Sequence, residues 1–381
     1  MSRRGFSLIE VLLAVAILAF VMAGVSTVLI LQIKVSAKQE LQRSLEENGR
    51  MALLEVARSV RQAGYGIAPT AAFDLDRYGC ATPGTTTSCN GGGRDRFDAP
   101  DELVVSSRDP SFYRNLTGIT GGAGPWTATL DRALTGPLSA GQVIQLLCAG
   151  AEPSSYVALA GPAIAGNTTL SLRAVSNADG YYPQGAPADS CFASAALMLV
   201  VRERYFIAPD PSDGLPSLWR DRGTGPPLLL DRGIEDLQIT YQIGSPSTGS
   251  LYATGGPLAV VPPVACAGAP GWIFGACLGT AGQPSETAAA PDWRADPYDS
   301  LNRYSANAVN VRAVGITIVA ISRVPSPDGT GDAVPAVGNR AARAPDTFKR
   351  SVLTTTEQTP NLLTRAHFLP PVFSQANVGG G

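Results

Sequence analysis

The sequence predicts an α+β protein, in which one long N-terminal helix crosses a membrane and then packs on a large β-rich, loop-rich head. Three features of the 381-residue chain predict this architecture. An apolar run lies near the N-terminus, a segment with helical spacing of apolar residues follows it, and the long remainder is rich in Gly, Ala, Pro, Ser and Thr. Because only 16% of the residues are charged, sheets joined by loops are favoured over a helical bundle.

The apolar run is residues 5–31, GFSLIEVLLAVAILAFVMAGVSTVLIL. An apolar segment of roughly 20 residues is long enough to span a bilayer as a helix. Arg3 and Arg4 precede the run and favour a cytoplasmic N-terminus, which places the rest of the chain outside the cytoplasm. The run passes directly into a polar helical pattern at Gln32, so we do not expect cleavage behind it, as in a secretory signal.

Glu10 is the one charged residue of this run. A carboxylate at hydrocarbon depth costs about 2.5–3.5 kcal/mol on insertion scales, so we expect a partner that becomes available only after processing or assembly. A newly formed α-amino group is such a partner, because opposite charges attract strongly at low dielectric constant. The pair would set the axial offset between apolar helices, which otherwise pack in lipid with little positional selectivity.

Residues 32–64 predict an amphipathic continuation of the same helix. Apolar residues recur there at helical intervals, whereas charged residues mostly fall elsewhere. The apolar set is Leu41, Leu45, Ala52, Val56, Val60 and Ala63. Gly64 and Gly66 mark the end of the helix. The alternative is a separate span and a soluble helix, with a break at Gly24 or at Ser26–Thr27.

The head is expected to form one large or two smaller β-rich domains. The clearest strand is 233–243, in which Leu237, Ile239 and Tyr241 alternate with polar residues, the period of a half-buried antiparallel strand. The expected strands are 102–106, 142–148, 169–172, 196–207, 233–243, 309–322 and 348–356.

All six cysteines follow the membrane run, in a compartment where disulfides persist. In chain order they are Cys80, Cys89, Cys148, Cys191, Cys266 and Cys277. An even count predicts three bridges, and the sequence alone permits about fifteen connectivities. Short spacing favours joining the first to the second and the fifth to the sixth, which leaves Cys148 with Cys191. Without C-x-x-C pairs and with one histidine, a zinc site is not expected.

The chain lacks a constellation of catalytic side chains. It has a single histidine, His367, no G-x-S-x-G elbow, and no GK[ST] sequel to its glycine-rich stretches at 91–93 and 121–124. We therefore expect neither an enzyme nor a cofactor. The acidic segments 210–213 and 328–332 are expected to be solvated turns, with calcium as the alternative, because neither carries the full EF-hand pattern.

The net charge of −2 provides no global basic field, so nucleic acid is not an expected partner. One local cluster could still bind phosphate. It consists of Arg340, Arg343, Lys349 and Arg350, but no interleaved aromatic residues accompany these cations.

The string RRGFSLIEVLLA resembles the class III signal of type IV prepilins. In that family a membrane aspartyl peptidase cuts after the glycine, and the new N-terminus is methylated. The resemblance implies cleavage between Gly5 and Phe6, N-methylation of Phe6, and a role in assembly register for Glu10.

The same resemblance implies a division of the chain. Residues 1–5 would be a cytoplasmic leader peptide. Residues 6–64 would be the pilin helix, with a transmembrane half at 6–31 and an amphipathic stem at 32–64, and residues 65–381 would be the periplasmic or extracellular head.

Five segments of the head are similar in order and spacing to PilW-type minor pilins. They are RERYFIAPD, SLWRDRG, LLLDRGIEDLQITYQI, VNVRAVGITIVAIS and the final strand FKRSVLTTT. The stretches 107–190 and 245–305 match nothing in this resemblance. We expect them to be loop insertions, in which any recognition specific to this head would lie.

The resemblance implies a minor pilin that helps other minor pilins and a PilY-type adhesin to prime type IV pilus assembly. Further implied partners are the major pilin, the prepilin peptidase and the inner-membrane assembly platform. The chain would span the bacterial inner membrane once, with its head in the periplasm, and would then sit at the pilus tip on the cell surface. The alternatives are a J-type pseudopilin of type II secretion and a tip adhesin or DNA-uptake subunit.

Overall fold

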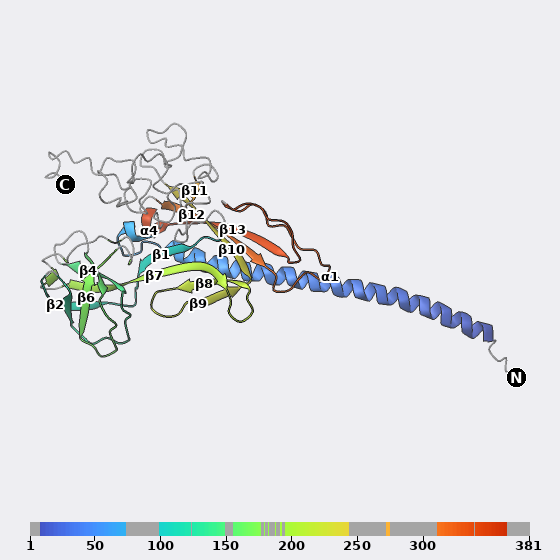
Figure 1. The fold of residues 1–381 in the computed structure, drawn as a ribbon, viewed down its shortest axis with the longest axis horizontal. Coiled ribbons are helices and arrows are strands. Elements are labelled where there is room, and N and C mark those ends of the chain that lie inside the picture. Colours follow the sequence, from blue (N-terminus) through green and yellow to red (C-terminus); the bar gives the residue numbers. More distant parts are fainter. Residues whose placement is uncertain are drawn as a thin grey trace, which may run out of the picture.

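A computed structural model describes two antiparallel sheets and one long helix. In continuous stretches it describes residues 8–73, 99–122, 124–148, 155–176, 191–192, 195–243, 272–274, 311–338 and 340–363, with the single residues 179, 182 and 187. Helix α1 (Leu8–Gln62) projects far beyond the head that packs on its C-terminal half (Figure 1). The predicted α+β class is therefore confirmed.

Helix α1 is continuous over 55 residues. It passes through Gly24 and Ser26–Thr27 unbroken, where the hydroxyl of Thr27 donates a hydrogen bond to the Ala23 carbonyl at 2.9 Å. At 1.5 Å per residue the helix is about 80 Å long. It ends at Gln62, and Gly64 has a φ of 73°, the left-handed conformation that commonly follows the end of a helix. The alternative of a span separated from a soluble helix is thus wrong.

The second half of α1 supplies one face of the main core. Its buried residues are Leu45, Gly49, Ala52, Val56, Ala57, Ser59 and Val60. The apolar members pack with residues from both sheets, as the helical spacing predicts. Gly49 permits a close approach, because a Cβ atom there would collide with Cδ1 of Leu353.

One sheet lies along the stem of α1. Its antiparallel order is β11-β10-β12-β13, with β10 at Ile234–Ile243, β11 at Trp272–Phe274, β12 at Val311–Ile321 and β13 at Arg350–Gln358. Alternate residues of β10 and β12, such as Leu237, Ile316 and Ile318, face the helix in the core. A short helix, α4 (Pro360–Leu363), follows β13.

A second sheet packs beside the C-terminal part of α1. It is formed by β1 (Leu103–Arg108), β7 (Ala195–Pro209), β8 (Pro216–Asp221) and β9 (Leu228–Arg232), all antiparallel. The 15-residue strand β7 is its centre, because its later residues pair with β1 on one side and with β8 on the other.

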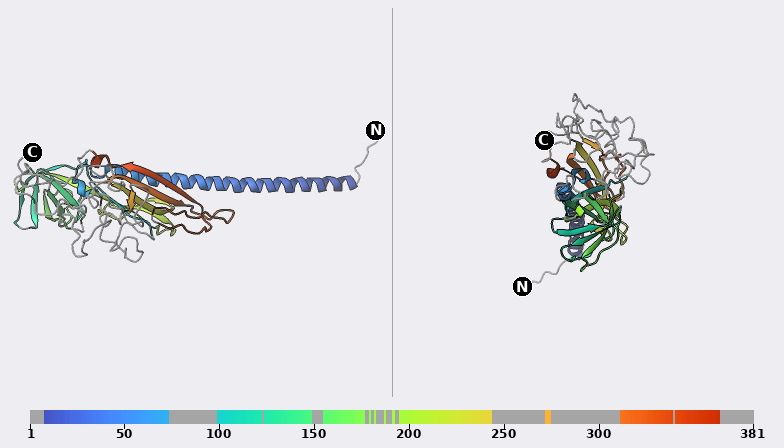
Figure 2. Two further views of the ribbon diagram at one scale, coloured as in Figure 1. Left: turned by 90° about the horizontal axis from the view of Figure 1, so that it is seen from above. Right: turned by 90° about the vertical axis from the view of Figure 1, so that its left-hand side faces the viewer.

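A closed barrel forms the end of the head farthest from the N-terminus (Figures 1 and 2). Five strands follow β1 in the chain: β2 (Arg114–Thr120), β3 (Trp126–Leu130), β4 (Val143–Cys148), β5 (Ser155–Leu159) and β6 (Thr169–Ala174). They pair in the order β2-β3-β6-β5-β4-β7, and β2 pairs again with β7. This second pairing closes the barrel and removes its open edges.

The barrel changes the interpretation of the stretch 107–190. We expected a loop insertion, but its described residues build a sheet around a separate core of 18 buried residues, including Trp126, Ile144 and Leu197. The barrel shares β7 with the second sheet: residues 195–199 pair with β2 or β4, and residues 200–209 pair with β1 or β8.

All seven strands predicted from the sequence are present, with ends shifted by at most two residues. The other predicted insertion, 245–305, lies outside the described residues apart from β11.

Candidate functional site

The exposed half of α1 is the candidate functional site. Among the described residues, α1 is the one helix long and apolar enough to span a membrane. Its large apolar side chains between residues 8 and 35 are about half to more than four-fifths exposed, with Phe20 at 84%. A helix that is apolar on all sides requires lipid or other apolar helices around it.

Glu10 lies in the first turn of α1. The unpaired backbone N–H groups of a helix N-terminus favour a carboxylate at this position. No described side chain of the chain forms an ion pair with Glu10. Gly5 and Phe6, the residues of the predicted cleavage site, lie outside them.

A buried polar cluster fixes the stem of α1 to β7. The hydroxyl of Ser59 donates to Oε2 of Glu203 at 2.6 Å and lies 2.6 Å from the hydroxyl of Tyr205. Nε of Arg222 donates to the other oxygen of Glu203 at 2.8 Å. Arg220 adds an ion pair to Glu55 of the helix at 2.6 Å. The sequence did not predict this cluster, although Ser59 on the apolar face of the stem was a signal for it.

The pKa values of two groups in this cluster, Glu203 and Tyr205, are shifted from their usual values. Burial alone raises the pKa of Glu203, but hydrogen bonds from Ser59 and Arg222 and the charges of Arg222 and Arg220 outweigh it, so the pKa lies below its usual value. Burial, followed by the negative charge of Glu203, raises the pKa of Tyr205. The glutamate is thus held ionised and the tyrosine neutral at physiological pH.

Two further contacts attach the end of the stem to β13 and to the short helix α4 that follows it. Arg61 makes a two-point contact with Glu357 of β13, at 2.7 and 2.9 Å. The side-chain amide of Asn361 donates to the carbonyl oxygens of Arg61 and Ala63, at 3.1 and 3.2 Å. These carbonyls have no partner inside the helix, so Asn361 acts as a cap.

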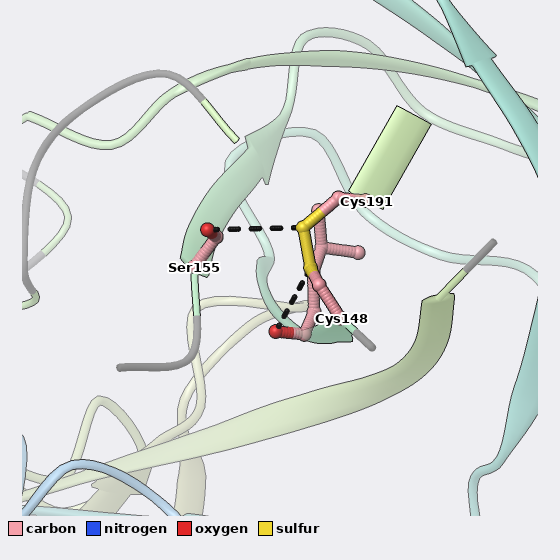
Figure 3. Close-up of a disulfide and its surroundings, with 4 residues drawn as sticks. Cys148, Ser155 and Cys191 are labelled. Carbon is pink, nitrogen blue, oxygen red and sulfur yellow. Dashed lines mark hydrogen bonds between the residues drawn. A yellow bond between two sulfur atoms is a disulfide. The ribbon is translucent and has the colours of Figure 1, made fainter. Parts of the chain in front are cut away.

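A disulfide joins Cys148 and Cys191, the third pair predicted from the sequence (Figure 3). Their Cα atoms are 4.7 Å apart, and Cys148 is the last residue of β4. Oγ of Ser155 lies 3.9 Å from Sγ of Cys191. The bridge ties the end of one barrel strand to the segment that enters β7. The other four cysteines, Cys80, Cys89, Cys266 and Cys277, lie outside the described residues.

Carboxylates in the two acidic segments for which calcium was the alternative bind other groups of the protein. Asp210 accepts hydrogen bonds from the backbone N–H and hydroxyl of Ser212 and pairs with Arg232 at 2.7 Å. Asp332 pairs with Lys349 at 3.1 Å. Within the part of the chain that the structure describes, no group of three or more His, Cys, Asp or Glu side chains is arranged to hold a metal ion.

The basic cluster near the C-terminus is paired as well. Arg340 pairs with Asp236, Arg343 with Glu235, Lys349 with Asp332, and Arg350 with both Glu235 and Asp346. The four cations that suggested phosphate binding in the sequence therefore form intramolecular ion pairs. His367 lies outside the described residues.

Comparison with known families agrees with the apolar, exposed N-terminal half of α1. Residues 1–26 match the family described as the prokaryotic N-terminal methylation motif. No curated protein and no solved structure matches the chain. The motif supports a membrane-anchored protein of the type IV pilin-like or pseudopilin class, made as a prepilin, with pilus-assembly machinery as its general partner. The narrower PilW-type resemblance has no counterpart in these comparisons.

We predict that the mature chain begins at methylated Phe6. The Gly5→Leu substitution should block cleavage, because its side chain adds bulk where the peptidase must approach the backbone. Mass spectrometry of the N-terminus is the measurement, with Ser2→Ala as the control that should leave cleavage intact. An intact Met1 in wild-type protein from cells with an active prepilin peptidase would contradict the prediction.

The Cys148–Cys191 bridge should be present in exported protein. Non-reducing peptide mapping should recover these two cysteines in one linked peptide. Replacing both by alanine should lower the free energy of unfolding by about 2–4 kcal/mol, because the bridge closes a long loop in the unfolded chain. Cys148 recovered as a free thiol, or joined to another cysteine, would show that this assignment is wrong.

Ser59→Ala should destabilise the full-length protein in detergent by about 1–3 kcal/mol, because it removes a buried hydrogen-bond partner of an ionised carboxylate. The control is Ser44→Ala on the exposed face of the same helix. The low folded-state pKa of Glu203 means that its contribution is complete above its unfolded pKa and is lost as the pH falls through the folded pKa. Thermal unfolding between neutral and acidic pH should show this loss in wild-type protein and a smaller one in Glu203→Gln.

Proposed function

We propose that the chain is a minor pilin that helps to prime type IV pilus assembly and then sits at the pilus tip. The observation that carries the proposal is α1, because its exposed apolar half overlaps the methylation motif at residues 1–26 while its stem packs against the head. The implied partners are other minor pilins, a PilY-type adhesin, the major pilin, the prepilin peptidase and the inner-membrane assembly platform.

The proposed mechanism is packing. Before assembly, the apolar half of α1 holds the protein in the inner membrane with the head in the periplasm. During assembly the same surface leaves the lipid for a core of parallel apolar helices. The carboxylate of Glu10 then pairs with the α-ammonium of Phe6 or of a neighbouring subunit, and this pairing offsets a burial cost that neither charge could bear alone.

The shape of the head supports a tip position. A subunit that repeats along a filament must leave room for the next copy, since open head-to-tail assembly reuses the same contact. In this chain the barrel lies beyond the C-terminal end of α1, at the end of the molecule away from the exposed apolar half of that helix (Figure 2). Bulk at that end suits a cap or a starting complex better than the body of a polymer.

The test uses Glu10→Ala, which removes the charge and leaves the apolar anchor. The variant should be cleaved and held in the membrane, but its amount in sheared pili should fall roughly tenfold, the effect of losing about 1.4 kcal/mol. Glu40→Ala, on the exposed stem of the same helix, is the matched control. Immunoblotting of sheared filaments gives the measurement.

Two outcomes would overturn the proposal. The first is wild-type protein present as the bulk subunit of the filament instead of far below the major pilin. The second is normal incorporation of Glu10→Ala in a background without redundant minor pilins. If the wild-type protein were recovered only with type II secretion pseudopili, the minor-pilin function would be wrong and the J-type pseudopilin function would replace it.

A further inference from the structure

Strand β13 is the outer strand of the sheet that lies along α1 (Figure 1). Among the described residues, β12 is the one strand that pairs with it. A strand at such an edge presents backbone N–H and C=O groups that can bind a further strand.

The register identifies the groups that face outward. Ser322 donates from its backbone to Lys349 at 2.9 Å, and Thr359 donates to Arg312 at 3.1 Å, so both ends of the β12–β13 ladder have directly hydrogen-bonded pairs. Such pairs alternate with non-bonded pairs in an antiparallel ladder. The odd-numbered residues of β13 therefore bond to β12. The even-numbered ones, Val352, Thr354, Thr356 and Gln358, direct their backbone groups away from it.

The outward row is accessible over the middle of the strand. The side chains of the same four residues are exposed and uncharged. At the start of the strand, the backbone N–H of Arg350 is bound by Asp332 at 3.1 Å, which closes that end. Among the described residues, the row without a backbone partner thus extends from Val352 to Gln358.

Three features by which natural proteins protect an edge are missing from this row. It contains no proline and no lysine, and the β12–β13 register has no bulge. The nearby charges are engaged elsewhere, since Glu357 binds Arg61 and Arg350 binds Glu235 and Asp346. The side chains of this row are mostly polar or β-branched. Threonine or valine side chains on an added strand would therefore pair favourably with them.

We propose that the edge of β13 accepts a β-strand from a different pilin-like subunit of the same assembly. This inference rests on the proposed function for its partner: subunits held in one membrane by parallel helices meet at a high effective concentration. A second copy of this chain does not fit antiparallel pairing. If β13 paired with β13 of a second copy, the two-fold axis between them would be normal to the sheet. Because α1 lies along the face of that sheet, this axis would make the two α1 helices point in opposite directions. Both helices must enter the membrane in the same direction, so this pairing does not fit.

The first test is Thr354→Pro. The Thr354 N–H points away from β12, so proline removes no hydrogen bond of the ladder, yet it blocks an added strand. In cells, the variant should reach the wild-type level in the membrane, while the partner that co-purifies with it falls at least roughly tenfold, a loss of about 1.4 kcal/mol. Thr354→Ala is the control and should keep the partner.

The second test places a photo-crosslinking amino acid at Thr356. The adduct from the membrane fraction should contain a peptide of a second protein that has its own N-terminal methylation segment. The same amino acid at Thr129 should give no such adduct, because Thr129 is also an exposed threonine but its strand β3 is paired on both sides, by β2 and β6. If the Thr354→Pro variant fails to accumulate, the crosslinked adduct at position 356 still tests whether a strand adds to β13.

An adduct confined to one chain, an adduct between two copies of this chain, or an unchanged partner yield in Thr354→Pro would overturn strand addition. If wild-type protein still appears in sheared pili in that case, the proposed function stands. If the adduct forms in membranes but the protein is absent from pili, strand addition stands and the pilus function fails.

Discussion

The packing of one helical face against two sheets is the contact on which the rest of the molecule depends. Gly49 lets α1 lie close to Ala320 of β12 and Leu353 of β13. Ala52, Val56 and Val60 are buried with residues of both sheets in one core. Burial of this face holds the head on the helix. The other half of α1 is left without a partner, so the same element joins a folded head to a surface that is stable only in lipid or among other helices.

The polar contacts at this boundary add direction to the apolar packing. Ser59, Glu203 and Tyr205 form a buried group that aligns β7 with the helix, and Arg61 and Asn361 fix the last turn. An ionised glutamate is tolerated there because a hydroxyl and an arginine both donate to it. The head is thereby fixed in rotation about the helix as well as in distance from it.

The sequence predicted the stem of α1 and seven strands, among them the short β1, β4 and β6. The stem of α1 and the strands β7, β10 and β12 each repeat their apolar pattern over ten or more residues, which identifies them without tertiary information. The short strands β2, β3, β5, β8 and β9 span five to seven residues, and several alternate threonine or charged residues with apolar ones. Their pairing into a barrel depends on contacts distant in sequence. At the candidate site, Glu10 was evident from its cost in lipid, whereas the partnership of Ser59 with Glu203 depended on residues 144 positions apart.

Strand β7 has a mechanical consequence. Its first residues belong to the barrel and its later residues lie in the sheet beside the stem, so one continuous backbone connects the two parts of the head. A force applied at the barrel and resisted at the membrane end of α1 would run along this strand. The hydrogen bonds of β7 with β1 and β8 would then be loaded together, in shear, and not opened one after another as in a peeled hairpin. The barrel is thus placed to transmit traction to the helix without first stretching a loop.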